Sequence, residues 1–466
     1  MQLTQRCFGG RCFGERCFGK LGSAKRWATR WVSTVLLASV GVGAQTAVPR
    51  AALAQEAVPE GAPPDESVLG ELLITGDVQE HVTPLAVLPS LSPDLEDVIV
   101  RGVVRRDFEL TGMFKVIPDE KAPPGLYGFD DPVDIKAWSK LGAEVIIKVA
   151  AQKQGPDTVK IFGLCYFLSH GRQPVYEKTL VVKNDQVRLT AHRITDALLG
   201  AITGRNGGFA SHLTFAAKAG KNPSIYTVDA DGHDIRALTL PSDTSIAPTW
   251  GPNGTLFFSQ SRKYSRFKLV QHEGPGIHLP FETSIYSVAF SADHRKLAVA
   301  VGTPVGSNLY VGNADGSNMQ QVSNTEVATH PVFSPSGKLA WIGGGGEKVG
   351  QRVYVDGKAV SPPSFSAAAP TFCDTEDGIM LVYAVAVGRG QDLVMANERG
   401  GNTRRLTQGE GSNSYPACSP DGRLIAFFSE RKEPGLYIKS LKSGKTQKIS
   451  SRVGESLRWA ALPGAQ

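Results

Sequence analysis

The stretch YPACSPDGRLIAFFSE, Tyr415–Glu430, places a proline, a cysteine, a Ser-Pro-Asp-Gly turn and an apolar strand close together. Cys418, Ser419 and Asp421 could form a reactive site, or the stretch could be one copy of a structural repeat. Related copies elsewhere in the chain favour the repeat. They are APTWGPNGTLFF from Ala247, YSVAFSADHRKLAV from Tyr286, HPVFSPSGKLAW from His330, APTFCDTEDGIML from Ala369 and a shortened ESLRWAALP from Glu455.

The equivalent positions of these anchor motifs recur at a nearly constant interval. Spacings of 40, 43, 39, 46 and 41 residues separate Trp250, Phe290, Phe333, Phe372, Cys418 and Trp459. A strand-turn-strand pattern keeps the same period, with copies that begin at Ser224, Asn308, Asp392 and Gly435. A period of about 40 to 45 residues with strands alone is typical of propeller blades. The sequence therefore predicts a six-bladed β-propeller over residues 208–466.

The first blade has its inner strand at His212–Ala217 but no anchor motif before it. We therefore expect the carboxy-terminal segment around 456–462 to complete that blade, because a ring closed in this way hides its sheet edges. Within each motif, proline is expected at the strand entrance, an aromatic residue between blades and glycine at the positive φ of the turn. By this comparison Cys418 is a buried blade residue and not a nucleophile. The loop that carries Asn413 and Ser414 is expected to open on a binding face.

Ahead of the repeat, residues 71–207 alternate between strand and helix patterns. The apolar runs predict strands, and the capping and 3.6-residue signals predict helices, which together indicate a small α/β domain with a mixed sheet. Leu95, Ile99 and Val103 are expected on the inner face of the first helix, and Ile135, Trp138 and Leu141 on that of the second. The predicted strands cover 84–89, 114–117, 144–150, 158–167 and 175–182, and the predicted helices follow Ser92, begin at Asp131 and run over 185–202.

The formal charge of +6 belongs to the amino terminus. Its first 54 residues carry eight of the 50 Lys and Arg but one of the 44 acidic residues, which leaves 42 basic and 43 acidic residues beyond it. This distribution argues against a nucleic-acid-binding surface. Lys25, Arg26 and Arg30 precede an apolar run, and small-residue cleavage patterns end at Ala44 and Ala54. We predict a signal peptide over residues 1–54, with cleavage after Ala54 favoured, and a Pro-rich acidic leader over 55–70.

Cysteine usage gives no support for metal binding or a disulfide framework. Cys7, Cys12 and Cys17 form a short repeat ahead of the apolar run, without a second ligand cluster. The remaining Cys165, Cys373 and Cys418 are an odd and sparse set. A chain with a large core does not need covalent crosslinks, so a disulfide framework is not expected.

Motifs that could carry chemistry have simpler interpretations as turns. KSGKT, 442–446, ends like a phosphate-binding loop, but the first glycine of that motif would fall on Lys439. DADGHD, 229–234, lacks the register and closing glutamate of a calcium loop and resembles a hairpin turn. Neither HExxH nor GxSxG occurs. We predict no catalytic residue, no metal and no cofactor.

The order of a signal peptide, a small α/β domain, the linker LLGAITGRNGGFASHLTFAA and six SPDG-type blades resembles the TolB family of the Tol-Pal envelope system. ELLITGDVQEHVTPLAVLP, 71–89, also resembles the family's mature amino terminus. The resemblance implies a monomeric periplasmic adaptor without membrane insertion, which acts in outer-membrane integrity and in envelope constriction at cell division. Its implied partners are Pal, the peptidoglycan-associated lipoprotein, and TolA, the inner-membrane energy-coupling protein.

Mapped onto this sequence, the resemblance gives two sets of partner-binding residues. The Pal-facing candidates precede the second and third anchors, and the TolA candidates form a short strand. They are Ser284, Tyr286, Ser287, Thr329 and His330 for Pal, and Leu72, Leu73, Ile74, Thr75 and Gly76 for TolA. The acidic leader and the missing proline between Ser284 and Ser287 depart from the family pattern.

Two other classes of protein remain open at this stage. An exported propeller could bind glycans or peptides in its funnel. The chain could also be a propeller relic of a prolyl-oligopeptidase-like hydrolase, although such hydrolases carry a separate domain with an elbow serine.

Overall fold

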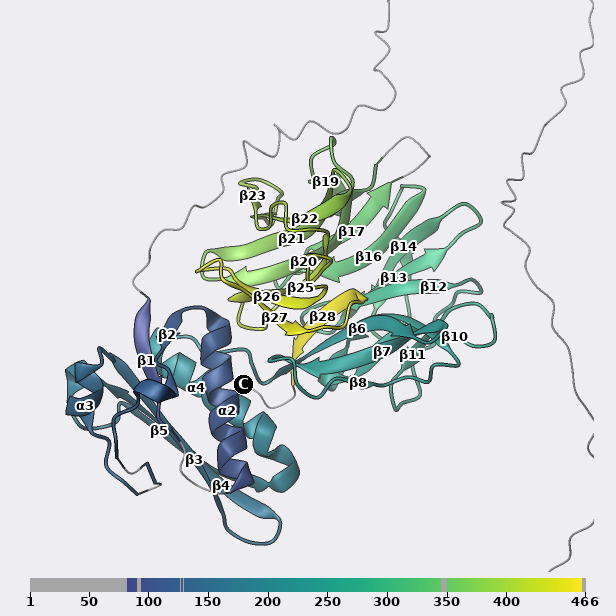
Figure 1. Ribbon diagram of the computed structural model, residues 1–466. Helices are drawn as coiled ribbons and strands as arrows, with labels where there is room; N and C mark the ends of the chain where they lie inside the picture. Colours follow the sequence, from purple (N-terminus) through teal and green to yellow (C-terminus); the bar gives the residue numbers. More distant parts are fainter. Residues whose placement is uncertain (1–81, 90–93, 126, 129, 345–349, 463–466) are drawn as a thin grey trace, which may run out of the picture. The chain divides into compact units, whose positions relative to one another are not determined.

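The structure is a computed structural model that describes residues 82–89, 94–125, 127–128, 130–344 and 350–462 (Figure 1). The predicted signal peptide, the leader and the candidate TolA segment 72–76 lie outside these residues. None of the helices within them is long and apolar enough to cross a membrane.

The first part of the described chain is an α/β unit around a five-stranded sheet with the order β2-β1-β3-β4-β5. Strand β1 runs parallel to β2 and β3, whereas β3, β4 and β5 are antiparallel neighbours, so the prediction of a mixed sheet is confirmed. The elements are β1 (Thr83–Val87), α2 (Leu95–Thr111), β2 (Phe114–Val116), α3 (Ile135–Lys140), β3 (Val145–Lys153), β4 (Thr158–Phe167), β5 (Tyr176–Lys183) and α4 (Val187–Thr203), with short 3-10 turns at Asp119–Lys121, Leu168–His170 and Asn184–Gln186.

The two faces of this sheet are covered by different helices. Successive residues of a strand point to opposite faces. Leu85 of β1 therefore packs in the cluster formed with α2 and α4, whereas its neighbour Ala86 packs with Trp138 of α3. The two long helices also contact each other and the central strands.

The inner faces of two helices were predicted in part wrongly. Helix α2 begins at Leu95 after Asp94, and the Leu95 side chain is exposed, while the buried stripe runs through residues such as Phe108. Helix α3 begins later than predicted, after Asp134, whose Oδ1 accepts a hydrogen bond from the Ala137 N–H at 3.0 Å. Leu141 follows the end of that short helix and is exposed. In both places an apolar residue beside a helix terminus was taken for part of the inner stripe.

From β6 onward the strands form six antiparallel groups, each contacting the next, which confirms the predicted propeller architecture (Figure 1). Two groups join in one sheet through a single parallel pair, Ser307 with Val327. The groups are β28 (Glu455–Ala461), β6 (Ser211–Ala219), β7 (Asn222–Asp229) and β8 (Arg236–Ala237); β9 (Thr244–Trp250), β10 (Leu256–Ser261) and β11 (Lys268–Gln271); β12 (Ile285–Phe290), β13 (Lys296–Gly302), β14 (Ser307–Asn313) and β15 (Gln320–Gln321); β16 (Val327–Phe333), β17 (Leu339–Gly344), β18 (Arg352–Val355) and β19 (Lys358–Ala359); β20 (Ala367–Thr375), β21 (Gly378–Val387), β22 (Gly390–Asn397) and β23 (Arg404–Arg405); β24 (Asn413–Cys418), β25 (Leu424–Ser429), β26 (Gly435–Ser440) and β27 (Thr446–Ser450).

The predicted closure of the ring is confirmed. Strand β28 pairs antiparallel with β6, from Glu455 opposite Ala216 to Ala461 opposite Ser211. The first strands of the six groups contact one another in a cycle, from β28 through β9, β12, β16, β20 and β24 back to β28. The inner strand of the first blade is therefore β28, and the prediction that residues 212–217 supply it was wrong.

Two cysteines of the propeller form a disulfide, so the interpretation that excluded disulfides was wrong for them. Cys373 at β20 and Cys418 at β24 are linked with their Cα atoms 5.4 Å apart. Their sequence separation of 45 residues is one blade, and β20 and β24 are neighbouring inner strands. Cys165 is unpaired and buried, and burial raises the pKa of its thiol to about 12, which makes it unreactive.

Candidate partner-binding face and domain junction

Every inner strand of the propeller is interrupted by a β-bulge. The register against the second strand shifts in all six groups. In five of them one bulge residue has a positive φ, namely Ala247, His330, Ala369, Tyr415 and Ser456. A proline follows four of these residues. A bulge leaves a residue out of the hydrogen-bond ladder, and proline has no N–H to donate to one.

This location changes the role assigned to the prolines. We expected proline at the strand entrance, whereas the structure places Pro331, for example, inside β16 between Thr329 and Val332, where the register shifts. The bulge turns the residue before the proline away from the regular alternation of the strand. In β12 the bulge falls at Tyr286 without a proline, so the missing proline there does not remove the bulge.

The structure brings the candidate Pal-facing residues together on two neighbouring inner strands. Ser287 of β12 is buried, and its Oγ accepts a hydrogen bond from the backbone N–H of His330 on β16 at 3.3 Å. Ser284 is half-buried, and its Oγ accepts from the N–H of Phe267 at 3.2 Å. Tyr286 is 38% exposed, while Thr329 and His330 are half-buried. Tyr286, Thr329 and His330 can therefore contact a partner, whereas the serine hydroxyls hold backbone in place.

His330 is a neutral residue at neutral pH. Burial lowers the pKa of His330 to about 4, and the positive charge of Arg458 acts in the same direction. Its ring lies 6.3 Å from the ring of Tyr415, the equivalent bulge residue of β24. A partner that binds beside His330 therefore meets an uncharged imidazole and the Tyr415 ring, with the cation of Arg458 nearby.

We expect this histidine to make the protein less stable as the pH falls from 6.5 toward 4. The unfolded chain takes up the His330 proton near pH 6.5 and the folded chain only near pH 4, so the unfolded state binds more protons between these values. The loss is at most about 3 kcal/mol, because solvent reaches the ring and screens the effect. Urea unfolding of the wild type and His330→Gln across this range measures it. Parallel pH profiles for the two proteins would contradict it.

Asn413 is the first residue of β24, and its own side chain does not reach the surface, although the loop before it is expected to open on a binding face. Its side chain is fully buried and accepts a hydrogen bond from Ser429 Oγ at 2.8 Å. It also donates to the carbonyl oxygen of Gly411 at 3.2 Å. The amide therefore fastens the loop before β24 to β25. Ser414 is half-buried.

The two faces of the propeller, which lie at opposite ends of its strands, have different neighbours. In an antiparallel blade the connections alternate between the two ends of the strands. The loops before the inner strands thus share one end, which we call the anchor-loop face. The turns after the inner strands lie at the other end, and residues there, such as Asp374 and Asp421, contact or neighbour the α/β unit. Tyr286 is near the start of its strand, at the anchor-loop end.

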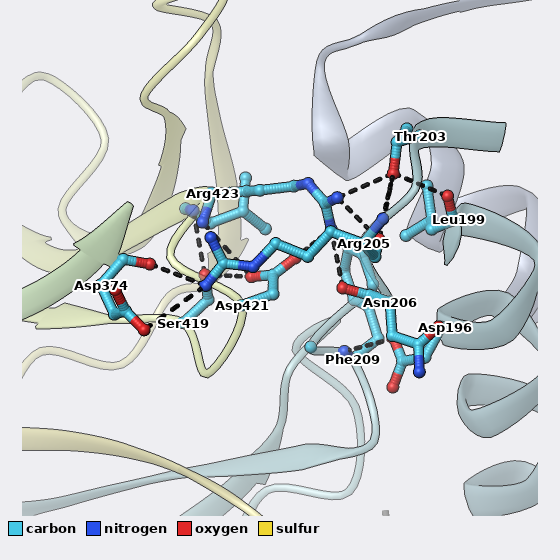
Figure 2. A network of polar contacts seen from close by, with 12 residues as sticks. Asp196, Leu199, Thr203, Arg205, Asn206, Phe209, Asp374, Ser419, Asp421 and Arg423 are labelled. Atoms are coloured by element: carbon cyan, nitrogen blue, oxygen red, sulfur yellow. Dashed lines mark hydrogen bonds and ion pairs between the residues drawn. The ribbon is translucent and has the colours of Figure 1, made fainter. Parts of the chain in front are cut away.

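Arg423 forms the centre of the junction between the α/β unit and the propeller (Figure 2). Its guanidinium donates to Thr203 Oγ1 at 2.8 Å, to the Arg205 carbonyl at 2.7 Å and to the Asn206 carbonyl at 2.8 Å. It also pairs with Asp421 at 3.0 Å, and both side chains are buried. One side chain after a propeller turn thus satisfies the carbonyls that follow the end of α4.

The Ser419–Gly422 turn, which directly precedes Arg423, requires glycine at its fourth position. Gly422 has φ 71°, and a Cβ there would lie 1.9 Å from the Asp374 carbonyl oxygen. That carbonyl accepts a hydrogen bond from Arg205 at 2.9 Å. The Ser-Pro-Asp-Gly turn was correctly predicted as a turn, but its contact with the α/β unit was missed. In other copies Thr255 and Lys338 occupy the position of Arg423, and the change to arginine in one copy does not by itself indicate a contact with the α/β unit.

Asp196 fixes the linker from the α4 side (Figure 2). Its two carboxylate oxygens accept the backbone N–H groups of Phe209 at 2.7 Å and Ala210 at 2.8 Å. Burial raises the pKa of Asp196 to about 7, and these two hydrogen bonds offset only part of that shift. The linker before β6 is therefore held from both sides, by Asp196 and by Arg423.

Two cavities open at this junction. One of about 450 Å³ is lined by residues of both parts, among them Met113, Glu376 and Arg423. Another of about 430 Å³ includes Val82 and Thr83, the first described residues, together with Lys442 of the propeller. The candidate TolA segment lies only a few residues upstream of Val82, but it is outside the described residues.

Comparisons with known proteins find similarity to TolB proteins over parts of this chain. Residues 71–163 match the model of the TolB amino-terminal domain. The Tol-Pal system protein TolB of Syntrophotalea carbinolica is 31% identical over 172 residues, which are 36% of this chain and 38% of the relative. TolB of Polaromonas naphthalenivorans is 25% identical over 37% of this chain and 39% of its own. These matches span well under half the length of the curated relatives.

The similarity of fold extends further than the similarity of sequence. The crystal structure of TolB from Acinetobacter baumannii matches with a TM-score of 0.65 and 16% identity, and the match covers 82% of this chain and 97% of the other. At this identity the match shows a shared fold.

Proposed function

We propose that this chain, whose residues 71–163 match the TolB amino-terminal domain and whose fold matches that of a TolB structure, is a periplasmic adaptor of the Tol-Pal system. It would bind Pal through the anchor-loop face of the propeller and TolA through residues 72–76. Its role would be in outer-membrane integrity and in envelope constriction at cell division, without catalysis. The observation that carries this proposal is the joint match of the amino-terminal domain and the two-part fold.

Two structural features support this proposal. The Cys373–Cys418 disulfide fits a protein that folds in an oxidising compartment such as the periplasm. The anchor-loop face carries half-exposed residues from neighbouring inner strands, including Tyr286 and His330, and lies at the strand ends opposite to the contacts with the α/β unit. An exposed tyrosine surrounded by partly buried side chains is a common centre of a protein interface.

We expect Tyr286→Ala to weaken Pal binding at least tenfold, because the loss of a central tyrosine typically costs about 2 kcal/mol of binding free energy. Calorimetric titration with the soluble domain of Pal measures the affinity. Ile235→Ala is the matched control, since Ile235 is 39% exposed, much like Tyr286, but lies in the turn between β7 and β8, at the opposite ends of the strands. Equal affinities for all three proteins would contradict the assignment of this face. Turnover of a peptide substrate, or binding of a glycan in place of Pal, would support the other classes of propeller.

The amino-terminal segment would couple the two partners. Val82 and Thr83 line a junction cavity, so residues 72–76 are close enough along the chain to occupy it in one state and leave it in another. A segment with two states can change the affinity of a distant face if that face differs between them. Deletion of residues 55–76 should then abolish TolA binding and change the affinity for Pal. Unchanged affinities for both partners would exclude this coupling.

A further inference from the structure

Side chains from inner strands that are not neighbours meet at the axis of the propeller. In the cycle of inner strands β16 lies opposite β28, and β20 separates β16 from β24. The ring of His330 on β16 nevertheless lies 6.3 Å from that of Tyr415 on β24, and burial and the charge of Arg458 on β28 both lower the pKa of His330. Such interactions run across the middle of the ring. The three side chains therefore converge at the axis, and all three are half-buried, so solvent reaches them.

The backbone and the size of the neighbouring side chains explain this convergence. His330 and Tyr415 are the positive-φ residues of their bulges, and a bulge turns a side chain away from the regular alternation of its strand. The other positive-φ bulge residues of the inner strands are small, namely Ala247, Ala369 and Ser456. Small side chains at these equivalent positions leave room near the axis for the longer ones.

Arg458 brings a positive charge to this place without a partner of opposite sign. Within the described part of the chain it forms no ion pair, and its guanidinium donates a hydrogen bond only to the neighbouring Leu457 carbonyl, at 3.3 Å. Burial lowers the pKa of Arg458 to about 10, and no nearby carboxylate offsets this shift. A cation that is partly removed from water without a counter-ion destabilises the folded chain.

The carboxylate of Glu455, at the start of the same strand, does not supply the missing charge. The register shift of β28 lies between Glu455 and Arg458. Burial raises the pKa of Glu455, and no cation offsets that shift. Its charge acts instead on Tyr415, whose pKa is raised by burial and by Glu455. Because the His330 imidazole is uncharged at neutral pH, Arg458 makes its own side of the axis electropositive.

We propose that Arg458 and His330 form a binding site for a small oxyanion, of the sulfate or phosphate type, at the axis of the propeller. The planar guanidinium offers parallel N–H donors that match two oxygens of such an anion, and a neutral imidazole adds another N–H donor. The His330 ring makes no hydrogen bond to any described residue, so its donor is available. The oxyanion would supply the counter-charge that Arg458 lacks. This site goes beyond the adaptor function and does not depend on its partners.

Calorimetric titration of the full mature chain with sodium sulfate, at an ionic strength held constant with sodium chloride, tests the proposal. We expect one sulfate to bind per chain. Arg458→Gln should weaken binding about tenfold or more, because it removes the charge-assisted hydrogen bonds. Arg389→Gln is the matched control, since Arg389 is exposed in the turn between β21 and β22, at the same ends of the strands as the anchor loops. It should bind sulfate like the wild type.

A second variant changes the charge in the opposite direction. Glu455→Gln removes the nearest acidic group of the strand, so it should bind sulfate at least as tightly as the wild type. Weaker binding by this variant would count against an anion at Arg458. Equal affinities of Arg458→Gln and the wild type would overturn the proposal.

A measurement on the wild type decides the matter even if a variant fails to fold. Selenate has the shape and charge of sulfate, and anomalous scattering at the selenium edge from crystals soaked in selenate should place the ion beside Arg458 and His330. Selenate found only at exposed cations such as Arg389 would overturn the proposal. An absence of sulfate binding by the wild type in the calorimetric titration would overturn it as well.

Discussion

Arg423→Met is expected to lower the free energy of unfolding by about 3 to 5 kcal/mol, the usual cost of breaking a buried ion pair by removing one partner. The change leaves the Asp421 carboxylate buried without its cation, at 7% exposure. It also removes the donors to the Arg205 and Asn206 carbonyls and to Thr203 Oγ1. Methionine keeps most of the volume of the side chain, so the loss reports on polar contacts and not on a cavity. Urea unfolding measures it.

The chain contains a matched control for this substitution. Lys338 occupies the equivalent position after the turn of another blade, where its Nζ lies 2.6 Å from Glu398 near the surface. Lys338→Met should cost no more than about 1 kcal/mol, because partly exposed ion pairs contribute little. Equal losses for Arg423→Met and Lys338→Met would show that the junction contacts of Arg423 do not stabilise the protein.

A double-mutant cycle separates the ion pair from the carbonyl contacts. In Asp421→Asn the guanidinium keeps its bonds to the α4 side, and in the double variant no charge is left unpaired. We expect an interaction free energy of about 1 to 3 kcal/mol between the two positions. Limited proteolysis should also cut the 204–210 linker faster in Arg423→Met than in the wild type, because Arg423 holds two linker carbonyls.

The repeat predicted the propeller because each anchor motif must make the same strand and turn. A motif repeated at nearly constant spacing implies that each copy forms an equivalent strand. Blades built from equivalent strands pack side by side into a closed ring. The same reasoning predicted the pairing of β28 with β6, since an unpaired terminal strand would leave an open edge. The α/β unit followed from helix and strand periodicity, and the errors at Leu95 and Leu141 lie at helix ends, where periodicity is weakest.

The site was less predictable because it depends on contacts between residues far apart in the sequence. The hydrogen bond from Arg423 to Thr203 joins residues 220 positions apart, and no motif near either residue predicts it. The bulges were missed for a different reason. A proline inside a short apolar run looks like a strand boundary, and only the register shifts show that β16 and its equivalents continue past it. The disulfide was missed because the prediction used only the number of cysteines. It did not consider that Cys373 and Cys418 lie near equivalent positions of neighbouring blades.

Removal of the Cys373–Cys418 disulfide is the second change expected to have a large effect. A crosslink that closes a loop of 45 residues stabilises the folded chain by about 4 kcal/mol in the chain-entropy account. The double variant Cys373→Ala, Cys418→Ala should therefore unfold at lower urea concentration than the wild type. Reductant should bring the wild type to the same midpoint and leave the double variant unchanged. A wild type whose midpoint equals that of the double variant under oxidising conditions would contradict this expectation.

The crosslink should also act on the junction, because each cysteine directly precedes one of the turns that face the α/β unit. Asp374 follows Cys373 and accepts a hydrogen bond from Arg205, while Ser419 follows Cys418 and begins the turn that carries Asp421 and precedes Arg423. The disulfide thus fixes the distance between the two turns. Sites that share partners are not additive, so Arg423→Met should cost less in the double cysteine variant than in the wild type. Equal costs in the two backgrounds would mean that the crosslink stabilises the ring alone and that the junction holds its geometry without it.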